Sequence, residues 1–313
     1  SEDFLTIAES VLETGVTTFL PTTMSEKPEL LLEAAESFRK AKENNEEGAE
    51  MPGIHFEGPY FGTGEEKGAQ NPENLREPDL DELEEWSEKT DGMIDRITLA
   101  PELSGAEEYI KKAKEMGITL SAGHTAADYE EAMKGFDAGI NVANHLYNGM
   151  ESFHHRNPGI IGATLTRDDV YAEMITDLIH LHPAAIDMAI RAKGVDNSIL
   201  ITDSIAATGL PDGEYELGGQ KIVVEGGTSR IKETGRLAGS TLRMEDAVKN
   251  VYSELDYDLK EVIQMVTLNP ARALGYSNRG RLNPGTLGNI TLLDSELNVL
   301  ATIVEGKILY ETS

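Results

Sequence analysis

Strand-like and helix-like segments alternate along most of this 313-residue chain. Runs rich in Val, Ile and Thr are each followed by a stretch with the apolar spacing of an amphipathic helix, which indicates parallel strands joined by helices. The strand-like runs lie at residues 16–21, 54–57, 94–100, 118–123, 140–145, 170–176 and 198–203. Helices are expected near residues 27–43, 79–89, 106–116, 127–138 and 183–193. The alternation therefore predicts an α/β fold built on a parallel sheet.

The number of strand-like runs predicts a barrel that is one strand short. A closed (β/α)8 barrel needs eight parallel strands, whereas the chain has seven such runs, and a helix at residues 3–14 precedes the first of them. Two further helices are expected near residues 244–255 and 259–275. We therefore expect a (β/α)8 TIM barrel over residues 1–275 that lacks its first strand in this chain.

Two segments fall outside the alternation. Residues 211–237 are rich in Gly and predict a β-hairpin excursion, with short strands near 221–224 and 230–232. The C-terminal tail, residues 276–313, has strand-like runs at 289–293, 299–304 and 307–310. These runs predict a small β satellite sheet beside the barrel.

Polar residues that can bind a metal or move a proton stand at or just beyond the ends of five strand-like runs. They are Glu57, His124, His145, His180 and Asp203. The C-terminal ends of barrel strands converge on one rim, where the active sites of such barrels lie. The spacing therefore predicts one site: a single His among them, taken alone, would more often be a buried core residue, but the set together favours metal ligation.

Composition narrows the classes of partner and ligand. A net charge of -29, from 56 acidic and 27 basic residues, opposes binding to nucleic acid and to anionic membranes. The chain has no apolar run of about 20 residues and no segment typical of a signal peptide, so a cytoplasmic location is expected. Because the chain has no Cys, only His and carboxylates are candidate metal ligands. The acidic surface is compatible with a high-salt habitat, although ordinary solvated helix faces and loops are the favoured explanation.

Eight motifs occur in order along the chain and identify a resemblance. They are His55-Phe-Glu-Gly-Pro59, Lys67-Gly-Ala-Gln-Asn-Pro72, Leu99-Ala-Pro-Glu102, Ser121-Ala-Gly-His124, Asn144-His-Leu-Tyr-Asn-Gly-Met150, His155-Arg-Asn-Pro-Gly159, Ile201-Thr-Asp203 and Leu237-Ala-Gly-Ser240. Together they make the whole chain resemble the N-acetylglucosamine-6-phosphate deacetylases of the amidohydrolase superfamily. The resemblance implies a further N-terminal segment that supplies the missing strand. It also implies hydrolysis of the acetamide of N-acetylglucosamine 6-phosphate, in amino-sugar catabolism.

The resemblance assigns roles at the rim. It implies that Glu57, His124 and His145 are metal ligands, and one carboxylate with two imidazoles can hold a divalent ion and leave a position open for water. Zn²⁺ is the expected ion, while Fe²⁺, Mn²⁺ and Co²⁺ accept the same ligands. Asp203 would take a proton from the attacking water and return it to the departing amine. His180 would contact the substrate and stabilise the developing oxyanion.

The resemblance also implies a set of substrate contacts and two departures from the family pattern. Arg156 matches a phosphate contact, which the fork of a guanidinium suits. The other implied contacts are Ala69, Gln70, Asn148, Gly149, His180, Leu237 and Gly239. Gln70 stands where the family has a histidine, and Leu178 stands where it usually has a glycine.

Several alternatives stay open. His55 lies two residues from Glu57 on the same strand face and is expected to support the ligands rather than bind the metal itself. One metal per subunit is expected and a second is left open, and the resemblance implies a homodimer. The substrate alternatives are another N-acetylhexosamine phosphate, such as N-acetylgalactosamine 6-phosphate, or none, if the barrel binds sugar without turnover.

Overall fold

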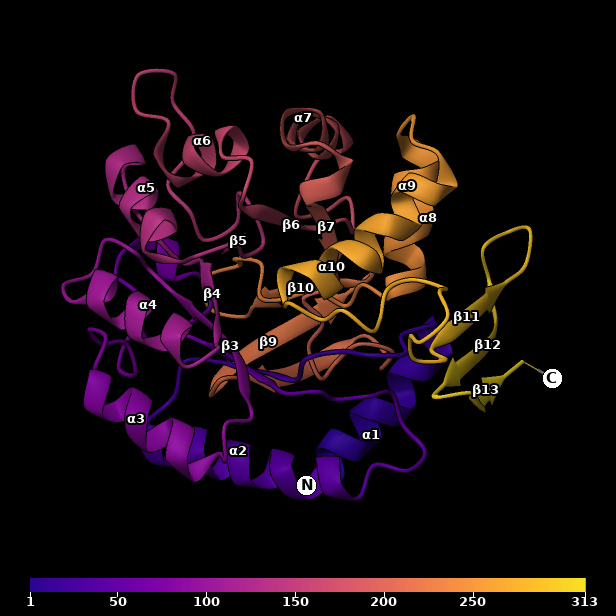
Figure 1. Cartoon of the computed structure of the whole chain (residues 1–313). Coiled ribbons are helices and arrows are strands. Elements are labelled where there is room, and N and C mark those ends of the chain that lie inside the picture. The colour runs from indigo at the N-terminus through magenta and orange to yellow at the C-terminus, as the bar shows by residue number, and fades with distance from the viewer. Residues whose placement is uncertain (313) are drawn as a thin grey trace.

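Seven parallel strands in sequence order form a curled sheet with helices along its outer face (Figure 1). The computed structural model describes residues 1–312. The strands are β1 (Thr22–Thr23), β2 (Ile54–Glu57), β3 (Ile94–Leu99), β4 (Thr119–Ala122), β5 (Val142–Ala143), β6 (Tyr171–Ile175) and β7 (Ser198–Ile201). Within residues 1–312, β1 pairs only with β2 and β7 only with β6. The predicted barrel architecture with seven strands is confirmed.

The helices follow the predicted alternation with one addition. They are α1 (Glu2–Ser10), α2 (Pro28–Glu43), α3 (Leu80–Lys89), α4 (Ala106–Glu115), α5 (Tyr129–Ala138), α6 (Gly159–Thr166), α7 (Pro183–Lys193), α8 (Met244–Glu254), α9 (Leu259–Val266) and α10 (Leu268–Ala273). Short 3₁₀ turns lie at Val11–Thr14, Glu65–Lys67 and Val195–Asn197. Helix α6 was not predicted, because its sequence Gly-Ile-Ile-Gly-Ala-Thr-Leu-Thr is buried on almost every side and lacks an amphipathic period. None of the helices in residues 1–312 is both long and apolar enough to cross a membrane.

The first strand and the last predicted helix need correction. A strand was expected at residues 16–21, but β1 lies at Thr22–Thr23, and Thr18 makes only an isolated bridge to Glu50. Pro21 has no N–H to donate, so the run before it is extended without a continuous ladder. The single helix expected at residues 259–275 is broken at Thr267 into α9 and α10. The break lies three residues before Pro270, whose ring would clash with the carbonyl one turn earlier in a continuous helix.

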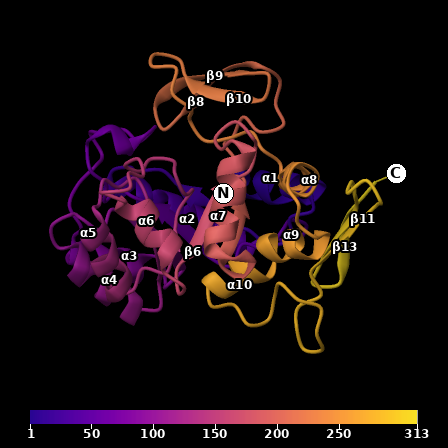
Figure 2. The ribbon, with the colours of Figure 1, turned by 90° about the horizontal axis from the view of Figure 1, so that it is seen from above.

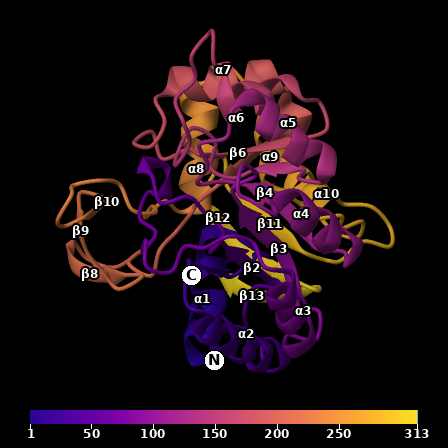
Figure 3. The ribbon, with the colours of Figure 1, turned by 90° about the vertical axis from the view of Figure 1, so that its left-hand side faces the viewer.

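The Gly-rich excursion has three strands rather than the two of a hairpin. Strands β8 (Gly213–Leu217), β9 (Gln220–Glu225) and β10 (Thr228–Ile231) form an antiparallel sheet that stands to one side of the barrel (Figures 2 and 3). Two-residue Gly-Gly turns with positive φ, at 218–219 and 226–227, join them, as tight hairpins require. Strand β8 was missed because two of the five residues in its sequence Gly-Glu-Tyr-Glu-Leu are acidic.

The C-terminal tail forms the predicted satellite sheet. Strands β11 (Ile290–Leu293), β12 (Val299–Val304) and β13 (Lys307–Glu311) are antiparallel. The sheet packs on the segment after α1, where Thr302 Oγ1 donates to Leu12 O at 2.7 Å and Thr291 Oγ1 donates to Gly15 O at 2.6 Å. Figure 1 shows these strands at one side of the barrel, next to α1. The two chain ends are therefore tied together.

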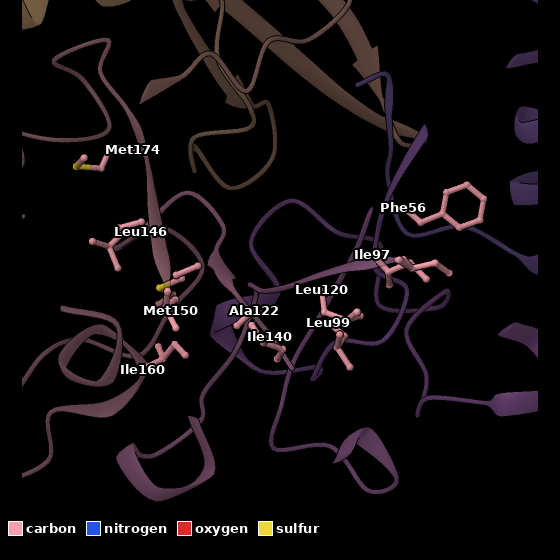
Figure 4. Close-up of a cluster of buried hydrophobic side chains, with 14 of the residues drawn as sticks. Phe56, Ile97, Leu99, Leu120, Ala122, Ile140, Leu146, Met150, Ile160 and Met174 are labelled. Atoms are coloured by element: carbon pink, nitrogen blue, oxygen red, sulfur yellow. The ribbon is translucent and has the colours of Figure 1, made fainter. Parts of the chain in front are cut away.

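The two faces of the barrel strands differ in polarity. Side chains on the outer face are apolar and fully or nearly fully buried; they include Phe56, Ile97, Leu120, Ala122 and Met174, which lie among the residues labelled in Figure 4. The alternating residues on the inner face are polar along β2, β3 and β4: His55, Glu57, Arg96, Thr98 and Ser121. Burial of the outer face against the helices stabilises the fold, and the inner face is left for polar contacts.

A buried ion pair crosses the barrel interior. Arg96 on β3 donates from Nη1 and Nη2 to the two carboxylate oxygens of Glu173 on β6, at 2.6 and 2.8 Å. Arg96 also donates to Ser121 Oγ at 2.8 Å and to Asn144 Oδ1 at 3.1 Å. Both charged side chains are less than a tenth exposed. Because neither charge reaches water, each depends on the other.

Removing one partner of this pair is expected to destabilise the protein strongly. Glu173→Leu should lower the free energy of unfolding by about 3–5 kcal/mol, since it leaves the Arg96 charge buried without a counter-charge. Urea unfolding followed by circular dichroism measures the change. The double variant Arg96→Met/Glu173→Leu should recover most of the loss. Glu214→Ala, which breaks the exposed pair with Lys232, should change stability by less than about 1 kcal/mol. A Glu173→Leu variant as stable as the wild type would contradict the assignment.

Candidate functional site

Strands β2, β4 and β5 bring three potential metal ligands to one point. Glu57 is the last residue of β2, and His124 and His145 each follow the end of their strand by two residues. One ligand atom from each of these residues lies within 4.8 Å of the others. His145 Nε2 is 3.2 Å from Glu57 Oε1 and 3.2 Å from His124 Nε2. The predicted convergence of these three residues at the barrel rim is therefore found.

The outer nitrogen of each imidazole is held by a backbone carbonyl. His124 Nδ1 lies 3.0 Å from Glu66 O, and His145 Nδ1 lies 3.0 Å from Asn148 O. A carbonyl only accepts, so both Nδ1 atoms carry the proton and both Nε2 atoms face Glu57. Metal-binding histidines are oriented in this way by a partner on the second nitrogen. The three residues thus fit a divalent cation with nitrogen and oxygen ligands.

The backbone at these strand ends adopts conformations that are rare for residues other than glycine. The φ angle is 48° at His124, 28° at His145 and 51° at Asp203. Left-handed conformations of this kind cost free energy and concentrate at functional sites, where the surroundings hold them in place. The three strand ends therefore share one backbone conformation.

The electrostatics of the centre favour a bound cation. Burial would raise the pKa of Glu57, but the imidazoles of His124 and His145 outweigh burial and hold its pKa well below the usual range. Burial would lower the pKa of His145, but Glu57 raises it to about 9. The ionised carboxylate therefore draws positive charge, which a proton or a metal ion can supply.

Asp203 lies at the same rim, two residues beyond β7. Burial and the negative charge of Glu57 raise the pKa of this carboxyl. Its backbone is fixed from behind, because Ser240 N donates to Asp203 O at 2.8 Å. Gly239 fits closely against this segment, since a Cβ there would lie 2.3 Å from the Ile205 side chain. Gly239, which was predicted to bind substrate, thus supports the backbone around Asp203.

His180 forms a pair with an acid that the sequence did not single out. His180 Nδ1 and Asp177 Oδ2 are 2.6 Å apart, and Asp177 Oδ1 accepts from His180 N at 2.8 Å. Burial would raise the pKa of Asp177, but the hydrogen bonds from His180 lower it. Leu178 between them has φ 62°. The left-handed conformation that a glycine adopts easily is therefore kept here by a leucine.

Most of the loop residues predicted to bind substrate lie against the three potential metal ligands. Asn148 supplies the carbonyl for His145, and its side-chain amide donates to His145 O. At Gly149 a Cβ would lie 2.8 Å from His124 Nδ1, so only glycine fits there. Gln70 donates to Glu57 Oε2 at 2.9 Å. Ala69 O accepts a hydrogen bond from Gln220 on β9, which ties this loop to the excursion.

Two residues predicted to bind substrate, Arg156 and Leu237, make no hydrogen bond to Glu57, His124 or His145 in the described part of the chain. Arg156 is exposed and its Nη1 lies 2.9 Å from His155 Nε2. Within residues 1–312, Arg156 makes no hydrogen bond or ion pair with Glu57, His124 or His145. Leu237 pairs with Arg230 beside the excursion sheet. Their predicted role in substrate binding therefore stays a prediction.

His55 contacts two threonine hydroxyls and, among residues 1–312, makes no hydrogen bond to the three potential ligands, so its support of them stays a prediction. Its Nε2 lies 2.6 Å from Thr98 Oγ1 and its Nδ1 lies 3.2 Å from Thr22 Oγ1. Burial and the nearby Arg96 lower its pKa well below the usual range. His55 is therefore a neutral member of the polar barrel interior.

The sequence analysis missed the residues that hold the site residues in place. They are Glu66, Arg96, Asn144, Glu173 and Asp177. A charge within an apolar strand is the feature that would have revealed Arg96 and Glu173, since such a charge must have a buried partner. Asn144 lies within one of the eight motifs and Asp177 directly follows the strand-like run at 170–176, but spacing alone does not tell which neighbour their side chains contact.

Comparison with known families identifies the chain. The model of the amidohydrolase family matches residues 1–309. The chain belongs to the amidohydrolase family. Enzymes of this family depend on metal ions, in agreement with the centre at Glu57, His124 and His145.

Named relatives of this amidohydrolase are similar over almost all of its length. It is 37% identical to the N-acetylglucosamine-6-phosphate deacetylase of Bacillus subtilis, over 95% of this chain and 76% of that protein. It is 36% identical to the N-acetylgalactosamine-6-phosphate deacetylase of Escherichia coli O157:H7, over 94% of this chain and 78% of that protein. The crystal structure of the N-acetylglucosamine-6-phosphate deacetylase of Thermotoga maritima superimposes with a TM-score of 0.93 at 37% identity, covering 99% of this chain and 83% of that one.

Metal binding is expected to stabilise the protein in a pH-dependent manner. After dialysis against a chelator, adding Zn²⁺ to about 100 times its dissociation constant should stabilise the fold by about 2.7 kcal/mol. Thermal unfolding with and without Zn²⁺ measures this. At one fixed Zn²⁺ concentration the gain should be larger at pH 8 than at pH 6, because the pKa of His145, raised to about 9, means that a proton must leave before the metal binds.

Two variants control this measurement. The double variant His124→Ala/His145→Ala should lose the Zn²⁺ effect, whereas His155→Ala, on the exposed loop, should keep it. A Zn²⁺ effect of equal size in the double variant would show that the cation binds elsewhere.

Proposed function

We propose that this amidohydrolase removes the acetyl group from N-acetylglucosamine 6-phosphate, giving glucosamine 6-phosphate and acetate. The observation that carries the proposal is the convergence of Glu57, His124 and His145 at a barrel rim that Asp203 also faces. The names of the relatives supply the substrate class. Zn²⁺ is the proposed metal, since it accepts both imidazole and carboxylate ligands in an open site.

Asp203 is the proposed proton carrier. A divalent cation held by Glu57, His124 and His145 would supply a Lewis acid that activates water and polarises the acetyl carbonyl. Asp203 would accept the proton of the attacking water and pass it to the nitrogen that leaves as the amine. Its raised pKa suits both steps, because a carboxyl that holds a proton more readily is a better base and, once protonated, can return the proton.

His180 is proposed to stabilise the negative charge that develops on the acetyl oxygen. Asp177 fixes the ring by its hydrogen bond to Nδ1, which leaves Nε2 as the atom that reaches the substrate. Asp177 therefore acts on the reaction by positioning His180.

Arg156 is proposed to bind the phosphate, with His154 and His155 beside it. The rings of these two histidines are 4.3 Å apart, and all three residues are exposed. On a protein with a net charge of -29, an anionic ligand needs a local group of basic residues. The substrate phosphate makes a cytoplasmic location part of the proposal, since phosphorylated sugars occur inside cells, and a homodimer is proposed from the family resemblance alone.

Acetate release tests the proposal directly. The purified protein, loaded with Zn²⁺, is incubated with N-acetylglucosamine 6-phosphate and, separately, with N-acetylgalactosamine 6-phosphate. Faster turnover of the first, lost with a chelator and restored by metal, is the expected result. Faster turnover of the second favours the epimer, which is the substrate in the name of the Escherichia coli relative. Absence of turnover on both, with metal bound, would leave a barrel that binds sugar without hydrolysis.

Asp203→Asn is expected to separate metal binding from turnover. The amide cannot accept the proton, so the rate should fall by about 10²–10⁴-fold while metal content is unchanged. In the wild type, the rate should decline as pH falls through the raised pKa of Asp203, because only the ionised form is a base. Rates and metal content measured from pH 5 to 8 check both statements. Near-normal turnover by Asp203→Asn would remove Asp203 from this role.

A further inference from the structure

Each carboxylate oxygen of Glu57 accepts a hydrogen bond from a side-chain amide. Gln70 Nε2 donates to Oε2 at 2.9 Å, and Asn144 Nδ2 donates to Oε1 at 2.6 Å. The two amides come from different parts of the chain: Gln70 from the loop between β2 and α3, and Asn144 from directly after β5. Both are buried, with 3% and 4% of their surface exposed.

The orientation of each amide is fixed at its other end. Gln70 Oε1 accepts from Ser25 N at 2.9 Å, and Asn144 Oδ1 accepts from Arg96 Nη2 at 3.1 Å. A backbone N–H and a guanidinium can only donate, so each amide must turn its oxygen toward them and its NH₂ group toward Glu57. The donors at Glu57 are therefore specified by the surroundings.

We propose that Gln70 and Asn144 are positioning residues that hold the carboxylate of Glu57 in the orientation of a metal ligand. Together they form an amide clamp, the pair of NH₂ groups bound to the two oxygens of Glu57. An ionised carboxylate offers about four lone-pair positions. The clamp occupies one on each oxygen and fixes the plane of the group, so that Oε1 is also directed toward His124 and His145, whose Nε2 atoms lie 3.7 and 3.2 Å from it.

The inference deepens the proposed function, because the metal ligated by Glu57 is the one on which that function rests. It also gives Gln70 a different role from the substrate contact implied by the family resemblance. Both ends of the Gln70 amide are occupied, by Ser25 N and Glu57 Oε2. Gln70 would therefore act on turnover through the metal ligand.

A simpler account is that Gln70 only anchors its loop. The same loop carries Asn74, a second buried amide, whose Nδ2 donates to Ser25 O at 2.9 Å and to Glu26 Oε2 at 3.0 Å. Among residues 1–312, Asn74 has no hydrogen bond to Glu57. Asn74 is thus a matched control: it anchors the same loop to the same residue, Ser25, without contacting the metal ligand.

The dissociation constants of Zn²⁺ and Co²⁺ test the clamp. They are measured by competition with a chromophoric chelator on the full chain, together with the absorption spectrum of bound Co²⁺, which reports ligand geometry. Gln70→Met keeps the length of the side chain and removes the donor, so metal affinity should fall by about 10–100-fold and the Co²⁺ spectrum should change. Asn74→Leu should lower the unfolding midpoint and leave metal affinity within about threefold of wild type.

A second variant covers the case in which Gln70→Met does not fold. Gln70→Asn keeps the amide but is one methylene shorter, so it cannot reach Ser25 and Glu57 together, and it too should weaken metal binding. Unchanged affinity and spectrum in whichever Gln70 variant folds would overturn the clamp. Equal loss of affinity in Asn74→Leu would overturn it as well, since anchoring of the loop would then explain both.

Failure of the clamp and failure of the proposed function give different results. Weakened metal binding in the Gln70 variants, with no acetate released by the wild type, keeps the clamp and rejects the function. Acetate release by the wild type with unchanged metal affinity in the variants rejects the clamp alone. A wild-type chain without measurable affinity for Zn²⁺ or Co²⁺ rejects both.

Discussion

The structure depends on keeping one ionised carboxylate, that of Glu57, inside the barrel. Moving such a charge out of water costs several kcal/mol unless hydrogen bonds and opposite charges replace its hydration. At Glu57 the replacements come from two amides and two imidazoles: Gln70, Asn144, His124 and His145. None of these four residues is adjacent to Glu57 in sequence, so the site exists only when β2, β4 and β5 are assembled.

Each of these partners of Glu57 is oriented by a further group. The position of Glu57 therefore depends on residues deeper in the barrel as well. Asn144 is oriented by Arg96, and Arg96 is neutralised by Glu173 on β6. The two imidazoles are held by loop carbonyls. The polar side chains inside the barrel thus form a continuous network from its interior to its rim, while the apolar outer face supplies the burial that stabilises the fold. A buried polar group without a hydrogen-bond partner costs free energy of folding. Each polar side chain in this network accordingly has a defined partner.

The sequence predicted the architecture well, because alternation of strands and helices is a property of consecutive residues. Errors arose where pairing or a neighbour decides the outcome: Pro21 moved the first strand and Pro270 divided the last long helix. At the site, spacing and family resemblance gave the residues that converge. They could not give Asn144, Asp177 or the true contact of Gln70, because the partner of a side chain is set by which strands lie side by side and by which atoms face each other at 3 Å.

The net charge of -29 creates a conflict for a protein proposed to bind a sugar phosphate. The surface repels an anion at long range, while a cation held at Glu57, His124 and His145 attracts it at short range. Salt screens the first effect far more than the second, because exposed charges interact through water whereas the centre is buried. The exposed loop that carries His154, His155 and Arg156 is one place where basic residues interrupt the acidic surface. The exposed loop and the cation would then recognise different parts of one substrate. The loop would attract the phosphate, and the buried cation would act on the amide.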